Sequence, residues 1–306
     1  MADRAVTLKN GRRLGVRGFG DPAATRVVVL CHPAPGSGGF DPDPLVTDSW
    51  AIHLQGVDRP GYGTSDPLPD DEPPRIVDRA EDLDAYLAQI REEAESSGSR
   101  VPRSVGVVGW SAGGRIALAL AARHPELVDR VAIVGTPAPD SAVRWVPEAY
   151  AEMNARLATL PVADARRELR AMLAGQVPTS AEPDPALLGA TEADAGALQQ
   201  PGALNRVHHM LAEAYQQGPI GVADDILSAA TDDWGFDLAD VQAPVLLVYG
   251  AADTVVPSAH GRWYRRQLAD ARLTVVPNAG HLAIIPAWRE VLEHVSPERG
   301  EPGRRS

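Results

Sequence analysis

The chain has 306 residues, of which 44% are hydrophobic, and a formal net charge of −12, so it can bury a sizeable core while its acidic surface disfavours nucleic acid and anionic membranes as partners. No segment approaches the roughly 18 uncharged apolar residues of a membrane span, and the N-terminus lacks the apolar stretch of an export signal. The single cysteine, Cys31, excludes an intrachain disulfide and fits a reducing compartment, so we expect a cytoplasmic protein.

Six short apolar runs, rich in Val and Ile, are predicted strands. In chain order they cover residues 27–30, 50–54, 105–108, 131–134, 245–249 and 273–276. Segments with the three- and four-residue apolar spacing of helices lie between them, at residues 76–90, 112–123 and 259–268. Strands that alternate with helices predict an α/β fold with a parallel, doubly wound sheet.

Residues 139–236 interrupt this alternation. The segment is rich in Ala, Leu and Glu, contains 14 acidic side chains against 6 arginines, and has helix-like patterns at residues 148–160, 165–173 and 203–216. We interpret it as a helical insertion whose charges form a solvated outer face, with an acidic approach to a site as the alternative. The predicted organisation is an α/β core of residues 1–138 and 237–295, the insertion at 139–236, and a disordered polar tail at 296–306.

Ser111 is the centre of the turn Gly109-Trp110-Ser111-Ala112-Gly113, which joins a predicted strand to a predicted helix. A serine in such a tight turn is held in a strained backbone conformation, and the glycines let the strand and the helix approach each other. The turn exposes the hydroxyl and puts the Ala112 N–H at a helix N-terminus, where a developing oxyanion is favoured. Ordinary glycine-rich turns also show this pattern, so the flanking strand and helix carry the prediction that Ser111 is a nucleophile.

Asp253 and His281 follow predicted strands and complete the chemistry that a serine nucleophile requires. A serine hydroxyl needs a base that takes its proton, and the base needs a carboxylate that orients it. Asp253 follows the strand at 245–249 and His281 the strand at 273–276, so both lie at the carboxyl ends of strands. Taken alone, Asp253 also fits a turn or a helix cap, and His281 a local hydrogen bond. The chain order Ser111, Asp253, His281 favours a hydrolase triad.

Two loops extend this pattern to a family resemblance. Residues 32–36 read HPAPG, similar to the HGxPG oxyanion loop of α/β-hydrolases, and residues 58–65 read DRPGYGTS, similar to the DRPGYGxS loop of that family. Together with the serine turn and the triad order, they make the chain resemble the α/β-hydrolase family over about residues 27–294, in the branch with a helical cap after strand six. The resemblance implies an α/β-hydrolase fold, a mostly parallel eight-stranded sheet flanked by helices.

The oxyanion loop departs from the family pattern at Pro33, which stands where the family has glycine. Neither Pro33 nor Pro35 has a backbone N–H to donate, and Pro35 restricts the residue before it to an extended conformation. Within this tripeptide only Ala34 can donate a hydrogen bond to an oxyanion. We therefore expect Ala34 and Ala112 to form the oxyanion hole.

Other residues near these motifs are predicted to have supporting roles. The family pattern makes His32 a structural support of its loop, and it makes Asp58 and Arg59 a loop-stabilising pair. Trp110, beside the nucleophile, is assigned to substrate binding as a wall of the pocket, with core packing as the alternative.

The insertion also contains metal-binding residue types, a His-His pair at 208–209 and an Asp-Asp pair at 224–225. Adjacent side chains on a helix diverge by about a hundred degrees, so the two histidines cannot hold one ion without help. The chain has no HExxH motif and no cysteine pair. We expect neither a metal nor a cofactor.

The sequence therefore predicts a cofactor-free serine hydrolase that cleaves a carboxylic ester, or a related acyl compound, of a small molecule through an acyl-enzyme. A hydrolase like the proline iminopeptidases or amidases is the enzymatic alternative, because the loops at 32–36 and 58–65 also resemble those of proline iminopeptidases. A non-catalytic binding protein with the same fold is the alternative of another class. The patterns specify no oligomeric state.

Overall fold

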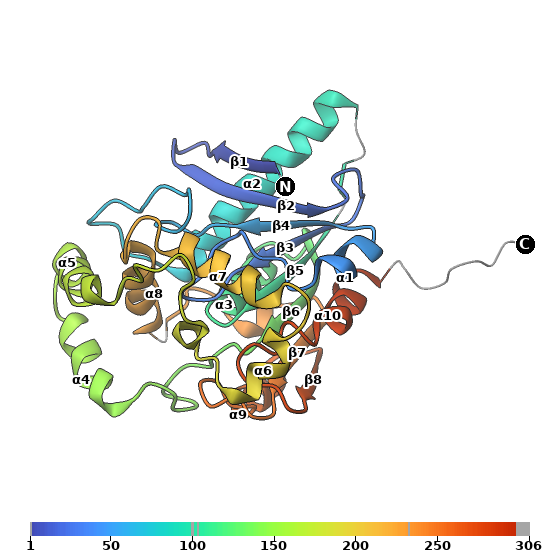
Figure 1. Cartoon of the computed structure of the whole chain (residues 1–306). Coiled ribbons are helices and arrows are strands. Elements are labelled where there is room, and N and C mark those ends of the chain that lie inside the picture. Colours follow the sequence, from blue (N-terminus) through green and yellow to red (C-terminus); the bar gives the residue numbers. More distant parts are fainter. Residues whose placement is uncertain (1, 99–100, 103, 232, 298–306) are drawn as a thin grey trace, which may run out of the picture.

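One eight-stranded sheet runs through the computed structural model (Figure 1), in which residues 2–98, 101–102, 104–231 and 233–297 are described. Its order is β1-β2-β4-β3-β5-β6-β7-β8. β1 pairs with β2, and β2 with β4, in antiparallel orientation, whereas all other neighbours are parallel, which confirms the mostly parallel sheet. The strands are β1 (Ala2–Thr7), β2 (Arg13–Gly20), β3 (Val27–Cys31), β4 (His53–Val57), β5 (Val105–Trp110), β6 (Val128–Val134), β7 (Val245–Gly250) and β8 (Ala271–Val276).

The predicted strands correspond to β3 through β8, with one shift in position. The run at 50–54 overlaps β4 only in part, because Trp50 caps helix α1 (Pro44–Ser49) and the strand begins at His53. The pattern does not detect β1 and β2, since the latter carries Arg13 and Arg17 among its apolar residues. An antiparallel edge needs no continuous apolar run, because one of its faces can remain polar.

Helices cover both faces of the sheet, and each face has its own hydrophobic core. α2 (Ile76–Ser97), α3 (Gly113–Arg123) and α9 (Ala259–Gln267) pack on one face, and α10 (Trp288–Val295) packs on the other. The side chains of β5 alternate between the cores, with Val105 and Val107 on one side and Val108 and Trp110 on the other. Because both faces are buried, the central strands are almost wholly apolar.

The described residues between β6 and β7 are mainly helical. α4, α5 and α8 share a small apolar cluster and lie beyond the end of the sheet at the left of Figure 1, whereas α7 packs Val207 and Met210 against one of the two main cores. The sequence patterns located α4, α5 and α7 but not α8. That these helices form a separate cap stays a prediction. The helices are α4 (Glu148–Leu157), α5 (Val162–Leu173), η1 (Ala174–Gln176), η2 (Pro185–Leu188), η3 (Glu192–Asp194), α6 (Ala195–Leu198), α7 (Ala203–Ala214), α8 (Ile220–Ala229) and η4 (Leu238–Asp240).

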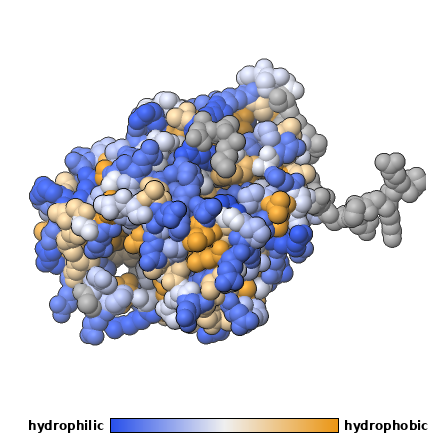
Figure 2. Space-filling model, viewed as in Figure 1, coloured by the Kyte–Doolittle hydropathy of each residue, from blue (hydrophilic) through white to orange (hydrophobic). Residues whose placement is uncertain are grey.

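The face of the molecule in Figure 2 mixes hydrophilic residues with smaller hydrophobic areas. Among the described helices, none has the length and the apolar character that a membrane span requires. Of the predicted disordered tail at 296–306, residues 298–306 lie outside the described residues, and Ser296 within them is buried.

The beginning of α3 packs against the ends of β3 and β5 with no room for a side chain. A Cβ atom on Gly113 would lie 2.1 Å from the Cys31 carbonyl oxygen, and one on Gly109 would lie 2.4 Å from the Gly114 Cα atom. Both separations are far shorter than the roughly 3.5–4.0 Å of a favourable carbon contact. The prediction that glycines beside Ser111 let the strand and the helix approach each other is confirmed.

We expect Gly113→Ala to lower the free energy of unfolding by about 1–3 kcal/mol, because the added methyl group must displace the backbone of β3. Urea denaturation measures the change. Gly196→Ala in α6 is the matched control, since a Cβ atom there has nothing within 4 Å, and it should leave stability equal or slightly raised. Equal unfolding free energies for Gly113→Ala and the wild type would contradict this account of the turn.

Candidate active site

Ser111 lies between β5 and α3 with a left-handed backbone, at a φ angle of 53°. A residue with a Cβ atom adopts this conformation only when its surroundings fix it. Here the Ser111 N–H donates to the Val134 carbonyl at 2.8 Å, and the Gly114 N–H donates to the Ser111 carbonyl at 3.0 Å. The strained turn predicted for Ser111 is therefore present, and its side chain lines a cavity.

The structure brings Ser111, His281 and Asp253 together in one hydrogen-bonded series. His281 Nε2 lies 3.0 Å from Ser111 Oγ, and His281 Nδ1 lies 2.8 Å from Asp253 Oδ2. Ser111 follows β5, Asp253 follows β7, and His281 follows β8, so each lies beyond the carboxyl end of a parallel strand. The geometry has the form of a nucleophile, a base and an orienting carboxylate.

Asp253 is fixed from both sides. Its Oδ1 accepts the backbone N–H groups of Val255 at 2.9 Å and Val256 at 2.8 Å, which leaves Oδ2 directed at the His281 ring. A carboxylate that accepts a hydrogen bond from Nδ1–H sets the imidazole tautomer. Nε2 then carries no proton and can accept a hydrogen bond from the Ser111 hydroxyl. His281 is 3% exposed, so the ring has little freedom to leave this position.

Ala34 and Ala112 line the same cavity as Ser111 and His281. Within the described residues, neither the Ala34 nor the Ala112 backbone N–H donates to another protein group. Ala112 immediately precedes α3, whose helix dipole favours negative charge at this end. The peptide between Ala34 and Pro35 is cis. Two unengaged N–H groups beside a nucleophile suit the binding of an oxyanion.

His32 supports its loop, as its family pattern implies. The ring is 1% exposed, donates from Nδ1 to the Pro33 carbonyl at 2.8 Å, and accepts the Arg59 N–H at Nε2 at 3.1 Å. Burial, together with the positive charge of Arg59, holds the pKa of His32 well below its ordinary value. A neutral imidazole that is engaged at both nitrogens has no proton acceptor left for catalysis.

Asp58 and Arg59 stabilise loops, but they do not pair with each other. Asp58 accepts the backbone N–H groups of Gly38 at 2.7 Å and Thr64 at 3.1 Å. The Arg59 guanidinium instead donates to the carbonyls of His32 and Pro33 and to Asp225 in α8. The loop-stabilising role predicted for both residues is therefore confirmed, and each fulfils it through partners of its own.

Trp110 does not line the cavity, so its predicted role as a pocket wall is wrong. Its side chain is fully buried and packs beside Phe40, with the ring centroids 5.4 Å apart. The indole N–H donates to the His281 carbonyl at 3.1 Å. The last residue of β5 points to the face of the sheet opposite α3, so Trp110 supports the loop that carries His281.

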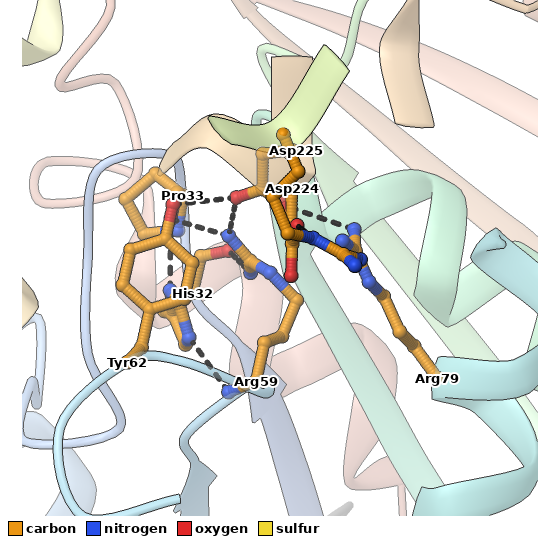
Figure 3. Close-up of polar contacts among 8 residues, drawn as sticks. His32, Pro33, Arg59, Tyr62, Arg79, Asp224 and Asp225 are labelled. Carbon is orange, nitrogen blue, oxygen red and sulfur yellow. Dashed lines mark hydrogen bonds and ion pairs between the residues drawn. The ribbon is translucent and has the colours of Figure 1, made fainter. Parts of the chain in front are cut away.

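A buried ionic cluster, which we define as Arg59, Tyr62, Arg79 and Asp225, joins α8 to the oxyanion loop (Figure 3). Asp225 Oδ2 accepts from Arg59 at 2.6 Å and from the Tyr62 hydroxyl at 2.7 Å, while its Oδ1 accepts from Arg79 at 2.7 Å. Burial by itself raises the pKa of Asp225, but the two guanidiniums outweigh it and lower the pKa to about 2. The neighbouring Asp224 pairs with Arg166 at 2.6 Å.

Sequence reasoning considered Asp225 only as a possible metal ligand, and it did not identify Arg79. One signal was present, because two consecutive aspartates stand among the apolar residues of the segment Ile220–Ala229. Carboxylates in an apolar helix require buried cationic partners. The sequence does not say which arginines supply them, since Arg59 and Arg79 lie more than a hundred positions away.

The cavity beside Ser111 has a volume of about 260 Å³. Its walls come mainly from apolar side chains of α3, η2, α8 and the strand-end loops, and its charged lining residues are Arg79, Arg115 and Asp225. A second, mostly apolar cavity of about 240 Å³ adjoins it and shares Ile76, Ile226 and Ser228 with it.

One group of described residues has potential metal ligands within reach of one another, namely Glu81, Asp84 and His124. His124 Nε2 already lies 3.2 Å from Glu81, and none of the three residues lines the Ser111 cavity. The pairs at 208–209 and 224–225 do not form such a group among the described residues.

A family model described as the alpha/beta hydrolase fold matches residues 26–287. The chain belongs to the α/β-hydrolase fold family. Its relatives include a pimeloyl-[acyl-carrier protein] methyl ester esterase of Chromobacterium violaceum, 32% identical over 238 residues that cover 76% of this chain and 77% of the relative. The enzyme of the same name from Aromatoleum aromaticum is 33% identical over 186 residues, 59% of this chain and 68% of the relative.

Solved structures agree with this α/β-hydrolase fold. A hydrolase from Pseudomonas aeruginosa has a TM-score of 0.64 at 22% identity and covers 95% of this chain and 97% of its own. A bromoperoxidase from Bacillus anthracis has a TM-score of 0.67 at 18% identity, with 95% and 98% covered. The fold family and the esterase names of these relatives support a serine hydrolase enzyme, which disfavours the peptidase and binding-protein alternatives.

Asp58, behind the oxyanion loop, is expected to make stability fall between about pH 4 and about pH 6. Burial raises its pKa from the ordinary 3.8 to about 6, although backbone N–H groups oppose the shift. The folded chain therefore holds a proton that the unfolded chain has lost. This stabilisation, about 3 kcal/mol, is complete below the unfolded pKa and is lost as pH rises through the folded pKa.

Asp58→Asn removes the titrating group, so its unfolding free energy should fall less than that of the wild type across this range. Urea denaturation at several pH values measures both curves. Parallel curves for the two proteins would contradict the raised pKa of Asp58.

Proposed function

We propose that the chain hydrolyses carboxylic esters of small molecules through an acyl-enzyme formed on Ser111. The proposal rests on the hydrogen-bonded series from Ser111 Oγ through the His281 ring to Asp253 Oδ2, at the wall of a cavity. Named relatives that act on a methyl ester support an ester as the substrate.

In the first step, His281 Nε2 takes the Ser111 proton while Oγ attacks the ester carbonyl carbon. Asp253 keeps the ring oriented and stabilises the imidazolium that forms. The carbonyl oxygen becomes negatively charged, and the N–H groups of Ala34 and Ala112 bind it. When the tetrahedral intermediate collapses, His281 gives its proton to the leaving alkoxide, and the alcohol departs.

In the second step, His281 takes a proton from a water molecule that attacks the acyl carbon. The same two N–H groups bind the second oxyanion. The bond between the acyl carbon and Ser111 Oγ then breaks, Oγ regains the proton from His281, and the free acid leaves. Nucleophile, base and oxyanion donors all belong to the chain, so the reaction requires no cofactor.

Residues 139–236 act, in this proposal, as a helical cap on a catalytic core of residues 1–138 and 237–295. Leu188 of η2, with Val222 and Ile226 of α8, lines the same cavity as Ser111. Apolar cap side chains next to the nucleophile favour an ester with an aliphatic part. The reducing cytoplasm is the proposed location, because it keeps the buried Cys31 thiol free.

A fluorophosphonate probe tests Ser111 directly. The wild type should be labelled covalently, and Ser111→Ala should lose both the label and ester hydrolysis, by about 10⁴-fold or more in kcat. Ser49→Ala is the matched control, because the Ser49 hydroxyl donates to the Val46 carbonyl outside the cavity. Nitrophenyl esters compared with proline arylamides measure the ester preference. Unlabelled folded wild type, or faster arylamide cleavage, would overturn the proposal.

Ala34→Pro tests the loop donor, because proline has no N–H. We expect kcat to fall by about 100-fold or more, with a smaller change in KM, since the donor acts on the transition state. Ala34→Ser keeps the N–H and is the matched control. Circular dichroism verifies that both variants are folded. Wild-type kcat in a folded Ala34→Pro protein would exclude Ala34 from the oxyanion hole.

A further inference from the structure

Arg79 is a buried guanidinium in the wall of the Ser111 cavity. The residue is 6% exposed and reaches the cavity from α2. In the part of the chain that the structure describes, its one side-chain hydrogen bond goes to Asp225 Oδ1, and its buried Nε atom has no partner. A buried donor without a partner costs free energy, so it calls for a ligand or another explanation.

The charge around Arg79 is not balanced by its one partner. Asp225 also accepts from Arg59 at 2.6 Å and from the Tyr62 hydroxyl, so a single carboxylate serves two guanidiniums. The side chains of Arg59, Arg79 and Asp225 are only 5–6% exposed, which limits compensation by solvent. The ionic cluster therefore holds one positive charge in excess.

Other carboxylates near the cluster are already engaged. Asp224 is paired with Arg166 and Asp82 with Arg12, although one oxygen of each carboxylate has no hydrogen-bond partner in the described residues. Asp253 accepts from His281 and from two backbone N–H groups. On the cavity wall, Arg115 adds a second guanidinium, held by the carbonyls of Pro137 at 3.1 Å and Ala138 at 3.2 Å. The charged lining of the cavity is thus two arginines and one aspartate.

We propose that the Ser111 cavity selects esters that carry a carboxylate at the far end from the ester bond, and that Arg79 binds this carboxylate. A planar guanidinium with free donors matches a carboxylate, and the surrounding low dielectric strengthens the pair. The apolar lining, which includes Ile116, Val222 and Ile226, suits the methylene chain between the two groups. The inference rests on the proposed function, since it names the substrate of the same site.

A purely structural role for Arg79 would be to hold α8 against α2 through Asp225. That role predicts that replacing Arg79 lowers kcat/KM by the same factor for charged and uncharged substrates. The ligand role predicts that kcat/KM falls more for anionic substrates than for neutral ones. The two roles therefore differ in the ratio of activities, not in the activity itself.

Three ethyl esters of similar length provide the first test. Monoethyl adipate is anionic, ethyl heptanoate is neutral and ethyl ε-aminocaproate is cationic at neutral pH. Hydrolysis in a pH-stat should give the highest kcat/KM for the anionic ester, about 10- to 100-fold above the neutral one, and the lowest for the cationic one. The pair δ-acetoxyvalerate and pentyl acetate places the charge on the alcohol part. A carboxylate preference in either series supports the inference, and its absence from both overturns it.

Arg79→Gln should lower the ratio of anionic to neutral kcat/KM by about 10-fold or more, chiefly through a higher KM for the anionic ester. Arg79→Lys keeps the charge and should restore part of the ratio. Arg123→Gln in α3 is the matched control, because this exposed arginine pairs with Glu81 and does not line the cavity, and it should leave the ratio unchanged. Equal losses for both esters in Arg79→Gln would assign Arg79 a structural role only.

Binding without turnover separates this inference from the proposed function. Ser111→Ala should bind adipate by isothermal titration calorimetry, and the double variant Ser111→Ala, Arg79→Gln should bind it about 10-fold more weakly or worse. Fluorophosphonate labelling and neutral-ester turnover without a carboxylate preference would overturn the inference and leave the esterase intact. No labelling and no ester turnover would overturn the proposed function itself.

Discussion

The left-handed backbone of Ser111 is the constraint on which the rest of the site depends. It persists because the Val134 carbonyl binds the Ser111 N–H and because the glycines at 109, 113 and 114 let α3 close on the sheet. This turn directs Oγ toward the ends of β7 and β8, where His281 lies at hydrogen-bonding distance from Oγ and Asp253 lies at hydrogen-bonding distance from His281. It also sets the Ala112 N–H at the start of a helix, where negative charge is favoured.

A second constraint is the buried guanidinium of Arg59, which couples parts of the chain that are distant in sequence. It donates to the carbonyls of His32 and Pro33, the two residues before the proposed oxyanion donor Ala34, and to Asp225 in α8. The same side chain therefore fixes the oxyanion loop and a helix between β6 and β7. Because removal of one member of a buried ion pair leaves an unpaired charge, this coupling is costly to break.

The charge of the cavity is opposite to that of the whole molecule. The chain carries a formal net charge of −12, yet two arginines and one aspartate are the charged residues on the cavity wall. In the segment 139–236, two of the acidic residues, Asp224 and Asp225, are buried and paired with arginines. Net charge governs approach and solubility, whereas the lining of a cavity governs which substrate it holds.

The sequence by itself determined the α/β-hydrolase fold and the order of Ser111, Asp253 and His281. Apolar runs locate buried parallel strands, and the carboxyl ends of such strands meet at one edge of the sheet, so local signals suffice. Only the tertiary structure decided that Trp110 faces away from the cavity, that Asp58 and Arg59 have separate partners, and that Arg79 and Asp225 meet. These outcomes depend on contacts between residues far apart in the chain and on the face that each side chain presents. Hydrophobic periodicity encodes which residues are buried, but not which buried charge meets which partner.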